Sequence, residues 1–158
     1  MNNQNVEFTY NRIQNILSEI PFFEEFENDE LDYFSNNLSL RAFPEDTVLF
    51  REGDYGDYLF FIVEGGVEVR LARSDAKSIV IASFEEGACI GEMSIVDNYA
   101  RSATIIVTKP SELLLLTRNR FESICKENPT IGIKFLKGIA KNLSSRLRKT
   151  TGRFADMS

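Results

Sequence analysis

One glutamate and one arginine stand nine residues apart in "IGEMSIVDNYARSAT" (residues 90–104), among mostly small and apolar side chains. The guanidinium of Arg101 can donate two parallel hydrogen bonds to phosphate oxygens, and it keeps its charge at physiological pH. Ser102 adds a hydroxyl beside it. The carboxylate of Glu92 is an acceptor suited to a pair of sugar hydroxyls. These residue types predict a site for a sugar phosphate.

The residues next to these side chains are small. At Gly91 and Ala103 little or no side chain intervenes, so backbone N–H groups can approach an anion closely and form a nest for it. The alternative for Glu92 and Arg101 is a surface ion pair at a turn, which is common and contributes little. The glycine and the Ser-Ala-Thr context favour ligand binding over that alternative.

The elements before this segment change from helical to extended periodicity. Apolar residues recur at helical spacing from about residue 8 to residue 40, and Pro21 divides them into two helices, the second with Asn28 as a predicted N-cap. From Ala42 onward, short apolar runs alternate with Gly/Asp turns. Roughly seven or eight strands at intervals of about ten residues predict a β-barrel or jelly roll.

Helical periodicity returns after the strands. Thr117 is a predicted N-cap, and Asn128-Pro129 separates the helix that follows from a longer one. The longer helix carries one apolar stripe made of Phe135, Leu136, Ile139, Ala140, Leu143 and Leu147. The predicted fold is therefore mainly β, a jelly-roll β-roll with helices at both ends.

The composition limits what the chain can do. A length of 158 residues predicts one domain, 1–158, with N-terminal helices in 1–41, the β-roll in 42–117 and C-terminal helices in 118–155. The net charge of −6 argues against bulk affinity for DNA or anionic membranes, although residues 128–158 are basic. The absence of histidine makes His-dependent metal sites and nucleophile pairs improbable, so we expect no enzyme and no metal.

The amino terminus, the lengths of the apolar runs and the cysteines together predict a cytoplasmic protein. The amino terminus is polar and lacks the pattern of a secretion signal, and no apolar run reaches membrane-spanning length. Cys89 and Cys125 are the only cysteines and stand far apart, which is not a disulfide framework.

Two separated motifs carry a resemblance to a known family. The stretch "FREGDYGDYLFFIVEGGVEV" (residues 50–69), with turn residues Gly53, Gly56 and Gly66, resembles the second hairpin of the cyclic nucleotide-binding domain. The stretch "GACIGEMSIVDNYARSAT" (residues 87–104) resembles its phosphate-binding cassette. The resemblance covers nearly the whole chain and implies a stand-alone regulatory module, without the DNA-binding domain found in some members.

The resemblance implies a role for each motif residue. Glu92 would hold the ribose 2′-hydroxyl beside a backbone group of Gly91, and Arg101 would pair with the cyclic phosphate. Further contacts to the nucleotide are implied for Ser102, the N–H of Ala103, Ile90, Met93 and, near the base, Arg146. In the family the last helix closes over the purine as a lid.

The predicted function is therefore reversible binding of a 3′,5′-cyclic nucleotide, with cAMP favoured over cGMP, as a signal read by an unidentified effector protein. No cofactor, direct DNA binding or membrane contact is expected. The rival prediction is an interaction or dimerisation module that binds no nucleotide. A symmetric homodimer through the stripe of the last helix and a monomer both stay open. A cupin-like enzyme is a remote third alternative.

Overall fold

A computed structural model describes residues 3–157, so the first two residues and the last one of the predicted domain lie outside the described part. The N-terminal segment contains α1 (Asn3–Glu19), the short 3-10 helix η1 (Pro21–Phe23) and α2 (Asn28–Ser35), so the predicted break at Pro21 is confirmed. The prediction of Asn28 as N-cap is wrong by one residue. Glu27 caps α2 in a capping box, in which the Glu30 side chain accepts the Glu27 N–H at 2.9 Å.

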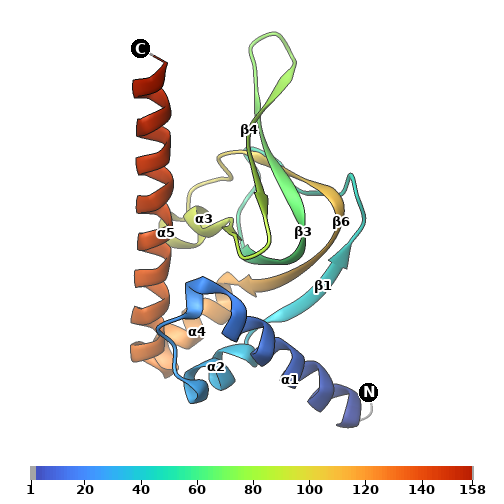
Figure 1. Ribbon diagram of the computed structural model, residues 1–158, viewed down its shortest axis with the longest axis vertical. Helices are drawn as coiled ribbons and strands as arrows, with labels where there is room; N and C mark the ends of the chain where they lie inside the picture. The colour runs from blue at the N-terminus through green and yellow to red at the C-terminus, as the bar shows by residue number, and fades with distance from the viewer. Residues whose placement is uncertain (1–2, 158) are drawn as a thin grey trace.

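Six strands form one antiparallel sheet that is rolled on itself (Figure 1). Their central order is β1-β6-β3-β4, while β2 pairs with β6 and β5 pairs with β3. The strands are β1 (Ser39–Phe43), β2 (Val48–Phe50), β3 (Tyr58–Ala72), β4 (Ser78–Glu85), β5 (Cys89–Ile90) and β6 (Thr104–Thr117). The predicted β-roll with flanking helices is confirmed.

The strand count is lower than predicted. The sequence pattern predicts a strand break at Gly65-Gly66 and another at Pro110, but β3 and β6 each continue through these residues. The turn expected in β3 is a register irregularity around Gly65, which has a φ of +104°. A Cβ atom there would lie 2.7 Å from the Cα of Ser111 on β6, so only glycine lets the two strands stay paired through the bend. Bulges of this kind bend a long strand without ending it, and the roll closes through two such strands.

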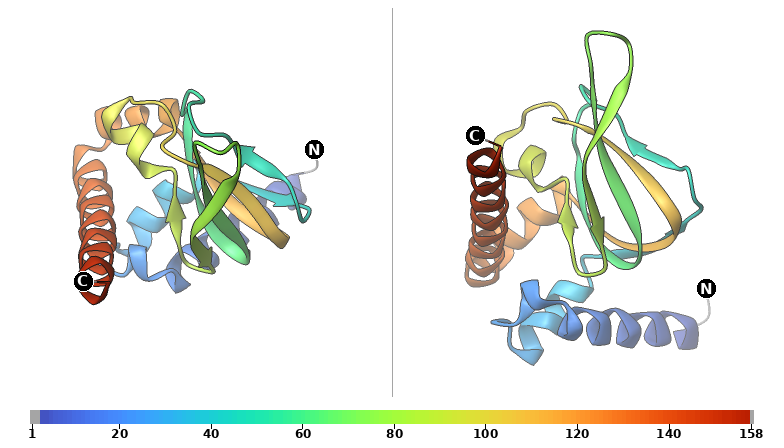
Figure 2. Two further views of the ribbon diagram at one scale, coloured as in Figure 1. Left: turned by 90° about the horizontal axis from the view of Figure 1, so that it is seen from above. Right: turned by 45° about the horizontal axis from the view of Figure 1, so that its top comes forward.

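The apolar core has two parts. One lies inside the roll and includes Phe60, Ile62 and Val107. The other lies between the sheet and the helices, where Phe135 of the last helix contacts the rings of residues from the N-terminal segment, β3 and the penultimate helix, namely Phe22, Phe23, Phe34, Phe61 and Phe121. Figure 2 shows the N-terminal helices packed beneath the roll, next to the start of the last helix.

The C-terminal helices are α4 (Arg118–Glu127) and α5 (Pro129–Asp156). The predicted cap at Thr117 is confirmed, since its side chain accepts the Arg120 N–H at 3.3 Å. Asn128, predicted only as part of the break between the two helices, also caps α5 by accepting the Ile131 N–H at 3.4 Å. The long helix α5 runs along one side of the roll and past the short helix α3 (Glu92–Asp97), as Figures 1 and 2 show. Within residues 3–157, none of the helices combines the length and the apolar character needed to cross a bilayer.

Candidate functional site

The segment 90–104 connects β5 to β6 through the short helix α3. Gly91 precedes α3 with a φ of +85°, and Asn98 ends it with a φ of 59°. A Cβ atom at position 91 would lie 2.8 Å from Nη1 of Arg101 and 3.1 Å from the carbonyl oxygen of Tyr58. Glycine is thus required at position 91 both by the left-handed backbone and by the arginine packed against it.

Arg101 is almost fully buried, with 3% of its surface exposed. Its Nη1 donates to the carbonyl of Gly91 at 3.0 Å and its Nη2 to that of Tyr58 at 2.6 Å. The guanidinium carbon lies 3.8 Å from the centre of the Phe50 ring, within cation–π distance. Burial lowers the pKa of Arg101, and the nearby Tyr58 and Asp57 oppose this shift only in part.

The charge of Arg101 has no ionised partner within residues 3–157. None of the salt bridges there includes Arg101, and its buried Nε has no hydrogen-bond acceptor. Buried charges in proteins are normally paired, since an uncompensated ion costs several kcal/mol in an apolar environment. A buried guanidinium whose direct contacts are carbonyls and a ring, without a salt bridge, is therefore suited to an anion.

The turn before β3 is fastened to Arg101. The Gly53 N–H donates to the Arg101 carbonyl, and the Arg101 N–H donates to the Asp54 carbonyl, both at 2.8 Å. A Cβ atom on Gly56 would lie 3.0 Å from Nε of Arg101 and still closer to the Ser94 side chain. The sequence assigned Gly56 to turn chemistry alone, whereas the structure also makes it the residue that leaves room for the arginine.

A second buried arginine, which the sequence pattern did not predict, lies near this loop. Arg118, at the start of α4, donates from Nη2 to the carbonyls of Gly56 and Ser94, the latter at 2.6 Å. Its Nε is also buried without an acceptor. It joins α4 to the turn before β3 and to α3. Arg118 belongs to neither an apolar pattern nor a turn motif, so the sequence does not predict that it is buried. The one unusual feature is a basic residue in the first turn of a helix, where the helix dipole disfavours a positive charge.

Glu92 is the first residue of α3 and has 1% of its surface exposed. Its Oε1 accepts from Nη1 of Arg146 at 2.6 Å and from Nδ2 of Asn142 at 3.4 Å, both residues belonging to α5. Nη2 of Arg146 also donates to the carbonyl of Cys89. Burial raises the pKa of Glu92, although Arg146 and Arg101 act in the opposite direction. The structure thus brings Arg146 to the predicted ribose acceptor.

The raised pKa of Glu92 predicts a pH-dependent stability. A native pKa above the ordinary 4.5 means that the folded chain holds this proton more tightly than the unfolded chain. The contribution of Glu92 to the free energy of unfolding is therefore full below pH 4.5 and declines as the pH rises through the native pKa. In urea unfolding between about pH 4 and pH 7, wild type should lose stability relative to Glu92→Gln as the pH rises.

The control for this measurement is Glu122→Gln, because Glu122 is exposed on α4. Its stability difference from wild type should stay flat over the same pH range. A wild type that gains stability relative to Glu92→Gln with rising pH would contradict the assignment of burial as the cause.

The remaining predicted site residues lie around the same loop. Ala103 and Ile90 are buried, and Ile90 belongs to the core inside the roll. Ser102 is exposed, and its Oγ lies 3.9 Å from Sδ of Met93. Met93 is itself 47% exposed on the outer side of α3. The contacts of these residues to a nucleotide stay predictions.

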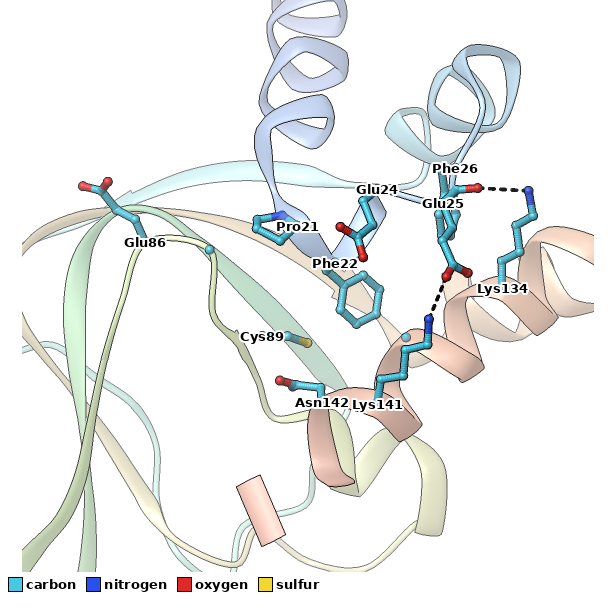
Figure 3. A pocket seen from close by; sticks show the side chains of 12 residues that line it. Pro21, Phe22, Glu24, Glu25, Phe26, Glu86, Cys89, Lys134, Lys141 and Asn142 are labelled. Carbon is cyan, nitrogen blue, oxygen red and sulfur yellow. Dashed lines mark hydrogen bonds and ion pairs between the residues drawn. The ribbon is translucent and has the colours of Figure 1, made fainter. Parts of the chain in front are cut away.

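A cavity of about 390 Å³ lies beside the loop, between η1 and α5 (Figure 3). Phe22, Gly87 and Gly138 line it, and Lys141 closes one side through an ion pair with Glu25 at 2.7 Å. Asn142 and Cys89 form the wall toward Glu92. Within residues 3–157, no group of three or more His, Cys, Asp or Glu side chains is arranged to hold a metal ion.

The chain is similar to known proteins over most of its length. A family model described as the cyclic nucleotide-binding domain matches residues 40–128. The crystal structure of a cyclic nucleotide-binding domain from Methylobacillus flagellatus superposes with a TM-score of 0.83 and 32% identity, over 94% of this chain and 84% of that one.

Two curated relatives are larger proteins. Lysophospholipase nte1 of Neurospora crassa is 33% identical over 61% of this chain and 6% of its own length. The cyclic AMP receptor protein of Thermus thermophilus is 26% identical over 82% of this chain and 58% of its own length. The chain thus spans less than two thirds of these curated relatives.

Proposed function

Because the chain belongs to the cyclic nucleotide-binding domain family, we propose that it is a sensor that binds a 3′,5′-cyclic nucleotide reversibly and without turnover. The observation that carries this proposal is Arg101, a buried cation that forms no salt bridge in the described chain and whose Nε has no acceptor. A cyclic phosphate has one negative charge and exposed oxygens, which suit a guanidinium. Ser102 and the N–H of Ala103 would bind the same phosphate, and a backbone group of Gly91 would lie beside the ribose.

The sugar and the base would lie on either side of this phosphate. Glu92 would accept from the ribose 2′-hydroxyl, while Ile90 and Met93 would contact the apolar parts of the ligand. We favour cAMP over cGMP, because the similar protein of Thermus thermophilus is named a cyclic AMP receptor. The hydroxyl of Ser102 is compatible with either base.

Signalling would operate through the C-terminal helices. A ligand shifts a conformational equilibrium only by its difference in affinity for the two states. Phosphate bound at Arg101 would bias α3, which contacts α4 through Arg118 and α5 through Glu92. An effector protein would then read the position of these helices.

Calorimetric titration of the purified protein with cAMP and then with cGMP tests the proposal. We expect saturable binding, tighter for cAMP. The sample must first be freed of copurified nucleotide, and its folding checked by circular dichroism. A folded sample that binds neither nucleotide would overturn the proposal and favour the interaction module instead.

One observation favours the dimer of the rival hypothesis, as an addition to nucleotide binding. The predicted stripe of α5 divides into two faces. Phe135 and Ile139 pack into the chain's own core together with Ile131, and the half-buried Leu143 lies against that core. A second set follows the alternating three- and four-residue spacing of a coiled coil and is exposed or half-buried: Ile133, Leu136, Ala140, Leu143 and Leu147. The spacing continues through the polar Thr150 to Phe154 and Met157.

We propose that this seam pairs with a second copy of the chain in parallel. In that arrangement, the residues flanking the seam bring no like charges together. Arg146 would lie near Thr151 of the second copy.

The variant Leu147→Glu should abolish this dimer, because it would place two carboxylates face to face in an apolar seam. Light scattering after size exclusion should show a dimer for wild type and a monomer for the variant. Ser145→Glu adds the same charge to an exposed position off the seam and should stay dimeric. A monomeric wild type at high concentration would contradict the proposal.

A further inference from the structure

Arg118 joins two segments that are far apart in the sequence. Its Nη2 donates to the carbonyl of Gly56, in the turn before β3, and to the carbonyl of Ser94 on α3, the latter at 2.6 Å. Its backbone N–H donates to the carbonyl of Asp57 at 2.7 Å. Only 8% of its surface is exposed, so these contacts lie inside the protein. The turn and α3 are therefore fastened to each other through this side chain as well as through Arg101.

The two residues that Arg118 joins are also packed against each other and against Arg101. A Cβ atom on Gly56 would lie 2.4 Å from the Cβ of Ser94 and 3.0 Å from Nε of Arg101. Only a glycine allows so close an approach. The same Nε is buried and has no acceptor, so no hydrogen bond of its own fixes its place. The position of the Arg101 side chain at this atom therefore depends on packing against residues that Arg118 holds.

Stability alone does not explain a second buried cation beside the first. Within residues 3–157, neither Arg101 nor Arg118 takes part in a salt bridge. Burial lowers the pKa of Arg101, and the charge of Arg118 lowers it further. Replacing buried ions by apolar side chains of similar size is often stabilising. A functional role for the pair is therefore favoured over a purely structural one.

We propose that Arg118 is a positioning residue of the phosphate site: it holds Gly56 and Ser94 together, and these two residues keep the guanidinium of Arg101 in the orientation that binds the phosphate. This inference rests on the proposed function for the identity of the ligand. An arginine side chain has many rotamers, and affinity is lost when binding has to order them. Arg118 contributes to affinity without touching the nucleotide, because part of this ordering precedes binding.

Calorimetry with cAMP tests the effect on affinity. Residues that orient a metal ligand typically contribute roughly 10- to 100-fold to affinity, and on that scale we expect Arg118→Met to bind cAMP about tenfold more weakly than wild type. Arg118→Lys keeps a charged donor for the two carbonyls and should recover most of the affinity. Arg120→Met changes an exposed arginine of the same helix and should bind like wild type. Circular dichroism must first show that each variant is folded.

Combining Arg118→Met with Arg101→Lys separates positioning from a general loss of structure. Arg101→Lys has no planar guanidinium to orient. If Arg118 acts through Arg101, then Arg118→Met should weaken binding by less than about threefold in the Arg101→Lys background. An equal loss in both backgrounds would mean that Arg118 supports binding independently of Arg101, and it would overturn the proposal. Unchanged binding by Arg118→Met alone would overturn it as well.

A second measurement needs no nucleotide. Nuclear magnetic resonance of isotope-labelled protein detects the Nε–H groups of arginine side chains, and the signal that Arg101→Lys removes is that of Arg101. Because this Nε is buried, its proton should exchange slowly with water in wild type. We expect the exchange to become at least about tenfold faster in Arg118→Met and to stay slow in Arg120→Met.

The two measurements separate this inference from the proposed function. If no nucleotide binds to wild type while Arg118→Met still speeds the exchange at Arg101, the positioning role stands and the proposed ligand is wrong. If the exchange at Arg101 is equally slow in wild type and Arg118→Met, the positioning role is wrong, whatever the nucleotide does.

Discussion

Replacing Arg101 by alanine should weaken cyclic nucleotide binding by about 2–5 kcal/mol, the typical loss when one partner of a buried charge pair is removed. The reason is that Arg101 is 3% exposed and that its guanidinium can donate two parallel hydrogen bonds to the phosphate oxygens. Calorimetry should show a dissociation constant that rises roughly 30-fold or more.

Two companions make this result specific. Arg101→Lys keeps the positive charge but cannot donate two parallel hydrogen bonds to the phosphate. Its affinity for the nucleotide should therefore lie between those of wild type and Arg101→Ala. Arg120→Ala removes an exposed arginine of α4 and should leave the affinity unchanged. The carbonyls of Gly91 and Tyr58 lose their donor in Arg101→Ala, so thermal unfolding must first show that the variant is folded. If the folded Arg101→Ala variant bound the nucleotide like wild type, the proposal that the phosphate binds at Arg101 would be wrong.

Phe135→Ala should lower the free energy of unfolding by about 3–5 kcal/mol, the range for removing a fully buried aromatic ring. Phe135 has no exposed surface, and its ring contacts those of Phe34 on α2, Phe61 on β3 and Phe121 on α4, with centres 4.9, 6.3 and 5.7 Å away. The ring therefore joins α5 to three other elements. Its loss leaves a cavity that these neighbours can fill only in part.

Urea unfolding followed by circular dichroism measures this effect. Lys137→Ala, an exposed position on the same helix, should change the free energy of unfolding by less than about 0.5 kcal/mol. A loss below about 1 kcal/mol for Phe135→Ala would mean that α5 is not anchored by this core. In that case, contacts other than those of Phe135 would have to hold α5 in the position that places Arg146 next to Glu92.

Both predictions depend on residues whose importance was visible in the sequence to different degrees. Arg101 stood out because its neighbours are small and because the motif around it is local, within fifteen residues. Phe135 was only one member of an apolar stripe, and nothing in its spacing distinguished it from Leu136, which proves to be exposed. A helical period places residues on a face but does not say which neighbour will cover that face.

The sequence alone determined the features that depend on short stretches of chain. The strand periodicity, the breaks at Pro21 and Asn128-Pro129, the cap at Thr117, and the small residues around Arg101 are all local consequences of backbone preference and side-chain size. Such preferences act within a few residues, so they can be read without knowing what lies nearby in space.

Only the tertiary structure decided which distant groups meet. Glu92 and Arg146 are 54 residues apart, and Arg118 and Gly56 are 62 apart. A long basic side chain has many rotamers, and its partner depends on how β5, α3 and α5 pack against one another. The bulge at Gly65, which merges two predicted strands into β3, likewise depends on Ser111 of a strand far along the chain. Packing selects these contacts, and no local pattern in the sequence encodes them.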